Sequence, residues 1–157
     1  MHIGILAVGR LKASPVLALF EDYARRLKWP LAVTEVEERR RLPHPALRER
    51  EGALLLEALE AGNRKAPHSL VIALDERGTA FNSTGFAERV GTWRDQGRDP
   101  LFIIGGADGL ARPVLDRAEL TLALGPMTWP HLLVRVLLVE QLYRAQSILE
   151  GHPYHRE

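Results

Sequence analysis

Short apolar runs alternate with helical patterns along the whole chain. Residues 2–8 and 31–37 are predicted strands, the second because apolar and polar residues alternate in it. Three further apolar runs, each bounded by turn residues, cover 70–74, 101–104 and 120–124. Continuous apolar strands are typical of a sheet that is buried on both faces.

Helical patterns separate these runs. Ser14 is a typical N-cap ahead of Pro15, and the helix that follows reaches about residue 28. The other predicted helices cover 45–61, closed by Gly62 and Asn63, then about 84–95, closed near Gly97, and 112–118. This alternation predicts an α/β fold with a mostly parallel sheet, helices on both faces, and ligands at the carboxyl ends of the strands.

The last predicted helix, residues 132–149, has almost no polar face in its first half. An open sheet covers only one side of a helix, so something else has to cover the other side. The same helix of a second copy would do so in a two-fold homodimer, and the alternative is a helix buried inside one domain. His131 and Arg135 share one face, whereas Glu140 and Arg144 pair on roughly the opposite side.

Length and composition narrow the class of protein. The 157 residues fit one domain, residues 1–157, without internal repeats or linkers. The absence of cysteine excludes disulfides, thiolate nucleophiles and cysteine-ligated zinc. Residues 1–8 lack the charged leader of a secretory signal, and Arg135 interrupts the apolar run 132–139, so no membrane span is expected. A cytoplasmic protein is the expectation.

The net charge of +1 gives the whole molecule no strong attraction to a phosphate backbone. Any contact with nucleic acid must therefore be local, and two basic sets are candidates. One comprises Arg39, Arg40 and Arg41 with Arg48 and Arg50, and the other comprises Arg135, Arg144 and Arg156. The first set lies beside three glutamates, Glu35, Glu37 and Glu38, so a solvated loop is its alternative interpretation.

Familiar catalytic motifs are missing from the sequence. The glycine cluster Gly105-Gly106-Ala107-Asp108-Gly109 follows an apolar run and either admits a ligand or only turns the chain. It lacks the dinucleotide-binding spacing, and neither a P-loop nor a nucleophile elbow occurs. Asp75-Glu76 follows another apolar run and either orients a ligand or forms a solvated turn. The class of reaction that remains is transfer of a group from an already activated donor. In such a reaction, the orientation of the two reactants by the protein supplies much of the rate.

The chain ends in a polar tail, Gly151-His152-Pro153-Tyr154-His155-Arg156-Glu157, which is too polar to bury itself alone. Its imidazoles, phenol and guanidinium are candidates for a ligand surface, and a solvated terminus is the alternative. His131, His152 and His155 match no strong zinc pattern, so no metal site is expected.

Several motifs spread along the chain occur together. They are Ile5-Leu6-Ala7-Val8-Gly9, Leu74-Asp75 with Gly78, Ile104-Gly105-Gly106 through Gly109-Leu110, Met127-Thr128-Trp129-Pro130-His131, Val134-Arg135, Glu140 through Ala145, and His152 through Glu157. Together they closely resemble the RlmH family of SPOUT methyltransferases. The resemblance runs from the first strand to the last residue. The Thr-Trp-Pro-His loop and the His-Pro-Tyr-His-Arg-Glu ending are its most specific parts.

The resemblance implies an S-adenosylmethionine-dependent enzyme that methylates N3 of a pseudouridine in the helix 69 loop of large-subunit ribosomal RNA, on assembled ribosomes. It also implies a homodimer and a deep trefoil knot in the C-terminal part of the chain. Chains generally avoid threading, so the knot is expected from the resemblance alone.

Site residues follow from the same resemblance. The cofactor contacts fall on Leu74, Gly105, Leu124, Gly125, Pro126, Met127, Thr128 and Trp129. The residues expected near the methyl group and the RNA are His131, Arg135, Arg144, His152, Tyr154, His155 and Arg156, with the tail completing the site of the partner subunit. In these roles the arginines meet phosphate, Tyr154 contacts the base, and an imidazole, Arg144 or the positive centre of the cofactor assists loss of the N3 proton.

Two rival functions come from other classes of protein. One is a non-catalytic ribosome-binding assembly factor with the same fold, and the other is a small flavodoxin-type protein that binds a flavin nucleotide.

Overall fold

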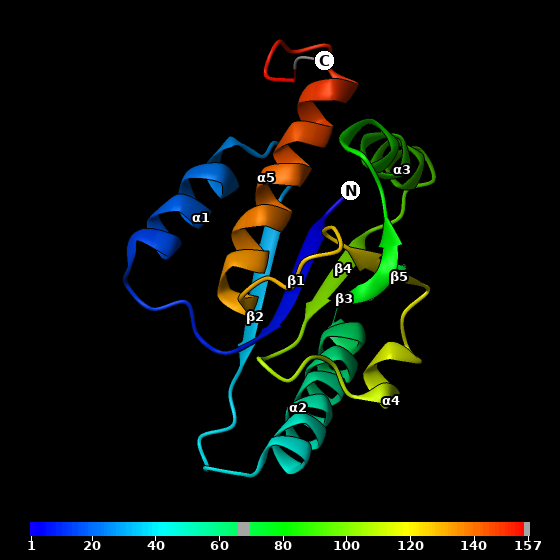
Figure 1. The fold of residues 1–157 in the computed structure, drawn as a ribbon. Coiled ribbons are helices and arrows are strands. Elements are labelled where there is room, and N and C mark those ends of the chain that lie inside the picture. The colour runs from blue at the N-terminus through cyan, green and yellow to red at the C-terminus, as the bar shows by residue number, and fades with distance from the viewer. Residues whose placement is uncertain (66–69, 156–157) are drawn as a thin grey trace.

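The structure is a computed structural model that describes residues 1–65 and 70–155. Five parallel strands form one sheet in the order β2-β1-β4-β3-β5 (Figure 1). The strands are β1 (Ile3–Val8), β2 (Leu31–Val36), β3 (Leu70–Ala80), β4 (Pro100–Ile104) and β5 (Leu120–Ala123). The predicted α/β class and parallel sheet are confirmed, and the trefoil knot stays a prediction.

Helices cover both faces of the sheet, as the sequence predicts. They are α1 (Pro15–Arg26), α2 (His44–Lys65), α3 (Ser83–Asp95), α4 (Arg112–Leu115) and α5 (His131–Leu149). Helices α1, α3 and α5 share one face, whereas α2 and α4 lie on the other (Figure 1). None of the helices in the described part of the chain is long and apolar enough to cross a membrane.

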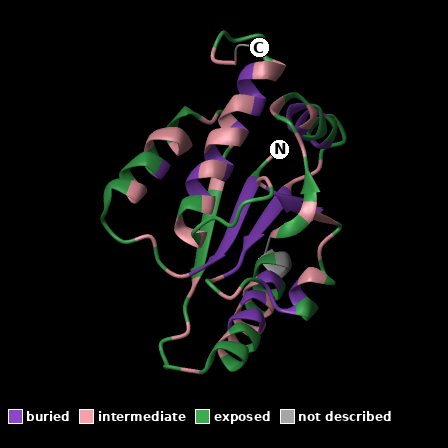
Figure 2. Ribbon diagram, viewed as in Figure 1, coloured by how far each residue is buried: buried purple, intermediate pink, exposed green. Residues whose placement is uncertain are grey.

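Alternate residues of each central strand belong to opposite cores. Ile3 and Ile5 of β1 pack with α1, α3 and α5, whereas Leu6 packs with α2 and α4. In β4, Phe102 packs in the core with α1, α3 and α5, whereas Ile103 packs in the core with α2 and α4. Figure 2 shows the central strands buried and the edge strand β2 mostly exposed. Continuous apolar runs therefore do mark the strands that are covered on both faces.

Local signals place some of the helix ends correctly. Ser14 caps α1 by accepting a hydrogen bond from the backbone N–H of Leu17, at 3.2 Å. Asn82 caps α3 in the same way through the N–H of Gly85, at 2.8 Å. The predicted stop at Gly62 and Asn63 is wrong, because α2 continues to Lys65. A single glycine costs a helix only about 1 kcal/mol, which neighbouring helical turns can offset.

Two other predicted boundaries are corrected. Helix α4 ends at Leu115 and not at residue 118, because the chain leaves the helix in a turn there. Strand β3 continues past Leu74 to Ala80, and its pairing with β5 shifts register between Leu74 and Thr79. The residues between them form a bulge, a feature that frequently lies beside functional sites.

Helix α5 lies between α1 and α3 against the sheet. Val136, Leu138, Val139 and Leu142 are buried within the single chain, whereas Leu133 is exposed. Much of the apolar surface of the helix is therefore covered without a second copy, as in the alternative of a helix buried inside one domain.

Candidate functional site

A cavity of about 350 Å³ lies at the carboxyl ends of β3, β4 and β5. The bulge in β3 and the loops after β4 and β5 surround it, and the start of α5 closes one side. The lining residues are Leu74, Asp75, Glu76, Arg77, Ile104, Gly105, Gly106, Ala107, Asp108, Gly109, Leu122, Leu124, Gly125, Met127, Thr128, Trp129, His131 and Val134. Its position is the one expected for a ligand in a parallel α/β sheet.

The β3 bulge supplies the first wall of the cavity. Arg77 donates to both carboxylate oxygens of Asp75, at 3.0 and 3.1 Å, and its backbone N–H donates to the same side chain. This contact with Arg77 lowers the pKa of Asp75, so the carboxylate stays ionised. At Gly78 a Cβ atom would lie 2.6 Å from the carbonyl oxygen of Thr121, so the strand can bulge here only with glycine. Asp75 and Glu76 therefore belong to a bulge within β3 that borders the cavity, and not to a turn between two elements.

The glycine cluster supplies the second wall. A Cβ atom on Gly105 would lie 2.8 Å from the carbonyl carbon of Gly109, and Gly109 itself has a φ of +76°. Behind this loop, Glu51 of α2 is almost fully buried, and its Oε2 has no hydrogen-bond partner. Burial, with a smaller contribution from Asp108, raises the pKa of Glu51. The glycine loop is therefore packed against itself at Gly105 and Gly109, and against the buried side chain of Glu51 behind it.

The loop from Leu124 to Trp129 supplies the third wall. Gly125 has a φ of +105°, a backbone conformation that favours glycine. Thr128 donates from Oγ1 to Oε2 of Glu76 at 2.8 Å, which ties the loop to the β3 bulge. The indole N–H of Trp129 donates to the carbonyl oxygen of Leu124 at 3.2 Å, and this bond closes the loop on itself.

The lining of the cavity carries an excess of negative charge. Asp75, Glu76 and Asp108 face it with Arg77 as the only arginine or lysine among the lining residues. Since Arg77 is already paired with Asp75, the remaining charge favours a cationic ligand over an anionic one. Among the described residues, no group of three or more His, Cys, Asp or Glu side chains is placed to hold a metal ion.

The expected cofactor residues gather at this cavity. Leu74, Gly105, Leu124, Gly125, Met127, Thr128 and Trp129 line it, and Pro126 does not. Sequence reasoning missed Glu51, because α2 carries several glutamates and no local pattern distinguishes the one that packs behind the glycine loop.

His131 and Arg135 lie one helical turn apart at the start of α5, where the carboxyl end of β1 meets them. His131 lines the cavity, and a Cβ atom on Gly9 would lie 3.4 Å from its Nε2. Burial, assisted by the charge of Arg135, lowers the pKa of His131, so the ring is neutral at neutral pH.

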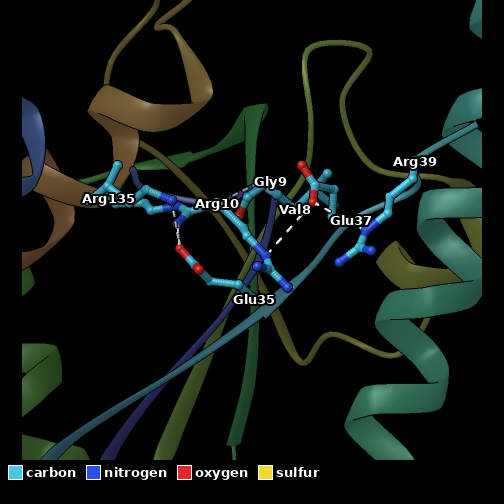
Figure 3. Close-up of polar contacts among 8 residues, drawn as sticks. Val8, Gly9, Arg10, Glu35, Glu37, Arg39 and Arg135 are labelled. Atoms are coloured by element: carbon cyan, nitrogen blue, oxygen red, sulfur yellow. Dashed lines mark hydrogen bonds and ion pairs between the residues drawn. The ribbon is translucent and has the colours of Figure 1, made fainter. Parts of the chain in front are cut away.

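Arg135 does not line the cavity. Its side chain is only 1% exposed, and it donates to the carbonyl oxygens of Val8 at 2.7 Å and Gly9 at 2.6 Å (Figure 3). It also donates to the carboxylate of Glu35 on β2. From this position the guanidinium cannot reach a phosphate in solvent, so the expected RNA contact is not available to it. The contact instead joins α5 to the ends of β1 and β2.

The tail residues lie together at the other end of α5. The ring of Tyr154 packs on Tyr143 with centroids 4.7 Å apart, and the guanidinium of Arg144 lies 4.9 Å from the centre of the same ring. The Tyr154 hydroxyl lies 3.1 Å from Oε1 of Glu140 and 3.3 Å from the hydroxyl of Tyr23. Burial raises the pKa of Tyr154, so the phenol keeps its proton. The tail therefore does pack on its own chain through Tyr154, which the sequence did not predict.

The other tail residues are less enclosed. His152 is exposed, and its Nδ1 accepts a hydrogen bond from the backbone N–H of Tyr154 at 3.2 Å. His155 is half-buried, and its Nδ1 has no hydrogen-bond partner. Arg156 lies outside the described residues.

The cavity and the tail lie at opposite ends of one helix. Helix α5 has 19 residues, which corresponds to a length of about 28 Å. Figure 1 shows the described residues after α5 at the end of that helix that lies opposite the loop leading into it. The single chain therefore does not bring Tyr154 or His155 to His131.

Comparisons with known proteins show the family and the fold to which this chain is similar. Residues 1–155 match the family model described as predicted SPOUT methyltransferase. The chain is 54% identical, over 99% of both lengths, to the ribosomal RNA large subunit methyltransferase H of Rhodospirillum centenum.

Solved structures resemble the chain at the level of the fold. A probable methylase family protein from Haemophilus influenzae superposes with a TM-score of 0.60 at 13% identity, over 99% of this chain and 70% of that one. The SpoU methyltransferase AviRb from Streptomyces viridochromogenes, solved in complex with AdoMet, superposes with a TM-score of 0.52 at 13% identity, over 92% of this chain and 58% of that one. With the family model and the close relative together, the chain belongs to the ribosomal RNA large subunit methyltransferase H (RlmH) family of SPOUT methyltransferases.

Proposed function

We propose that this protein is an S-adenosylmethionine-dependent methyltransferase of large-subunit ribosomal RNA. Its substrate is N3 of a pseudouridine in the helix 69 loop of assembled ribosomes, and it acts in the cytoplasm as a homodimer. Membership of the RlmH family and the name of the relative from Rhodospirillum centenum support the ribosomal RNA substrate.

The observation that carries the proposal is the cavity at the carboxyl ends of β3, β4 and β5. Its carboxylates suit a cofactor with a positively charged sulfonium. The same charge opposes the phosphate of a flavin nucleotide, which argues against the flavodoxin-type alternative. AviRb, a fold neighbour, is solved with AdoMet, and this supports the same cofactor here.

The chain's own residues provide orientation and a proton acceptor. When bound, S-adenosylmethionine would supply a methyl group that N3 takes up by in-line attack on the methyl carbon, as the bond from sulfur to methyl breaks and S-adenosylhomocysteine leaves. The turns at Gly105 and Gly125 let the ligand approach the backbone closely. His131 is neutral and borders the cavity, so it is placed to accept the proton that leaves N3.

Arg135 has a positioning role in this proposal. It fixes the first turn of α5 to Val8 and Gly9 and thereby holds His131 at the edge of the cavity.

The tail acts on the cavity of the partner subunit. Because Tyr154 reaches back along α5 only to Glu140, which still lies about 14 Å of helix beyond His131, a second copy is needed to bring Arg144, His152, Tyr154, His155 and Arg156 to the methyl group. In the partner's site, the arginines contact phosphate and Tyr154 contacts the base.

The test uses purified full-length protein, S-adenosylmethionine and ribosomes from cells that lack the gene. Mass spectrometry of the ribosomal RNA is expected to find one new methyl group on the N3 of a pseudouridine in helix 69. A chain truncated after Leu149 is expected to lose this activity and to retain cofactor binding in calorimetry. A truncated chain with full activity would refute the role of the tail.

A different result would favour the assembly-factor alternative. In that case the protein would bind intact ribosomes and S-adenosylmethionine but leave the RNA unmethylated.

A further inference from the structure

The arginine-rich segment between β2 and α2 has no role in the site described so far. Arg39 and Arg40 are exposed on this segment, and Arg10 is exposed just after β1. Arg10 lies 3.7 Å from Oε2 of Glu37, and Arg39 lies 3.9 Å from the same oxygen on the other side (Figure 3). Two arginines thus flank one carboxylate at the carboxyl edge of the sheet.

These ion pairs are unequal in exposure. The side chain of Arg39 is 76% exposed and that of Glu37 only 36%, and the side chain of Arg40 is 66% exposed and that of Glu38 only 8%. The carboxylates therefore lie inward and the guanidinium groups outward. A partner approaching this surface meets positive charge, even though the numbers of acids and bases along the segment are nearly equal.

The inner acids also fix the arginines in place. Glu38 accepts hydrogen bonds from the guanidinium groups of both Arg40 and Arg50, at 3.0 and 3.1 Å. The contact with Arg40 lowers the pKa of Glu38 to about 2, so the pair persists at every physiological pH. Each guanidinium has five N–H donors, and the pairs occupy only some of them. The remaining donors are available to an anion.

The arginines lie on the same edge of the sheet as the cavity. Strand β1 separates β2 from β4, and neighbouring strands are about 4.8 Å apart, so the end of β2 is about 10–15 Å from the ends of β4 and β3. Arg135 links the two regions, since it contacts Gly9 and Glu35 (Figure 3). His131, one helical turn before it, lines the cavity. Several nucleotides of RNA span such a distance.

We propose that Arg10, Arg39 and Arg40 bind phosphate groups of the RNA strand that flanks the base in the cavity. The inference rests on the proposed function for the identity of the RNA. Guanidinium groups form paired hydrogen bonds with phosphate, and their planar fork is pre-organised by the inner glutamates. These contacts position the strand and carry no base specificity.

Salt dependence of ribosome binding tests the proposal. Removing one arginine–phosphate pair lowers the slope of log affinity against log salt by about 0.7 to 0.9. The double variant R39A/R40A is therefore expected to have a slope smaller by about 1.4–1.8. The loss of ribosome affinity in this variant, relative to wild type, is therefore expected to be about tenfold larger at about 50 mM KCl than at about 200 mM KCl. Binding is measured by co-sedimentation with intact ribosomes at constant magnesium.

Two further variants separate charge from structure. R39K/R40K keeps the charge and is expected to keep most of the wild-type slope. R94A removes an exposed, paired arginine from the end of α3, at the opposite edge of the sheet, and is expected to bind as wild type does. Cofactor binding is expected to be unchanged in every variant.

The proposal is overturned if R39A/R40A binds ribosomes with the wild-type affinity and slope. It is also overturned if affinity falls with an unchanged slope, because the contact would then be with a protein surface. Failure of the wild type to methylate ribosomes would refute the proposed function, whereas the binding data would still test the phosphate contacts.

Discussion

The contact between Arg135 and the ends of β1 and β2 makes a sharp prediction for stability. Methionine at this position keeps much of the side-chain volume and removes the guanidinium. The hydrogen bonds to Val8, Gly9 and Glu35 are then all absent. Breaking a buried ion pair costs about 3–5 kcal/mol. Because Glu35 is partly exposed and regains water, we expect the lower end, about 3 kcal/mol.

The matching substitution on β2 has a comparable effect. Glu35→Gln keeps the two carbonyl contacts of Arg135 but leaves its buried guanidinium without a counterion, so we expect a loss of about 2–3 kcal/mol. The double variant E35Q/R135M is expected to be less destabilised than the sum of the single variants, because the two side chains contact each other.

Urea unfolding followed by circular dichroism, at one fixed protein concentration, measures these free energies. For a domain of this size the R135M variant is expected to melt about 6–12 °C below wild type. A variant R135M within about 0.5 kcal/mol of wild type would refute the view that this guanidinium holds α5 to the sheet.

Three other predictions concern the cavity. Gly105→Ala is expected to weaken S-adenosylmethionine binding at least about tenfold in calorimetry, because its Cβ would lie within 3.0 Å of the backbone of Gly109; unchanged affinity would mean that the loop yields freely. Because the pKa of His131 is lowered, its ring stays neutral at pH values below the ordinary histidine pKa of about 6.5, and the methylation rate is expected to fall only at still lower pH. The variant His131→Gln is expected to lose this acid limb of the pH-rate profile. An acid limb that persists in the variant would exclude His131 as the proton acceptor. Burial raises the pKa of Glu51, so this side chain lowers the free energy of unfolding as the pH rises above the pKa of an unfolded glutamate. The variant Glu51→Gln is therefore expected to raise the melting temperature more at neutral pH than at about pH 4.3. An equal gain in melting temperature at both pH values would contradict this prediction.

Much of the fold follows from short-range signals in the sequence. The apolar runs of β1 and β4 predict strands covered on both faces, and both are fully buried. Ser14 and Pro15 mark the start of α1 through a bond that spans only three residues. Such signals depend on local geometry alone, so one sequence is enough to detect them.

Long-range contacts explain what the sequence did not predict. The bulge after Leu74 exists because β3 pairs twice with β5, and glycine is required at position 78 because the backbone of Thr121 leaves no room for a Cβ atom. Arg135 interrupts an apolar helix in the sequence, and its partners Gly9 and Glu35 are distant along the chain. No periodicity in the sequence indicates such partners.

The same reasoning applies to the tail. A terminal Tyr154 with polar neighbours predicts exposure, but Tyr23 of α1 lies across from it and encloses it together with Glu140. The enclosure depends on how α1 packs against α5.

The central claim is that the tail of one subunit completes the cavity of the other. Two variants with different tags are co-expressed, Gly105→Val, which blocks the cavity, and a chain truncated after Leu149. Each is expected to be inactive alone, whereas the mixture is expected to methylate ribosomes at about a quarter of the wild-type rate, because half of the dimers are mixed and each holds one complete site. A mixture as inactive as its separate components would contradict the account.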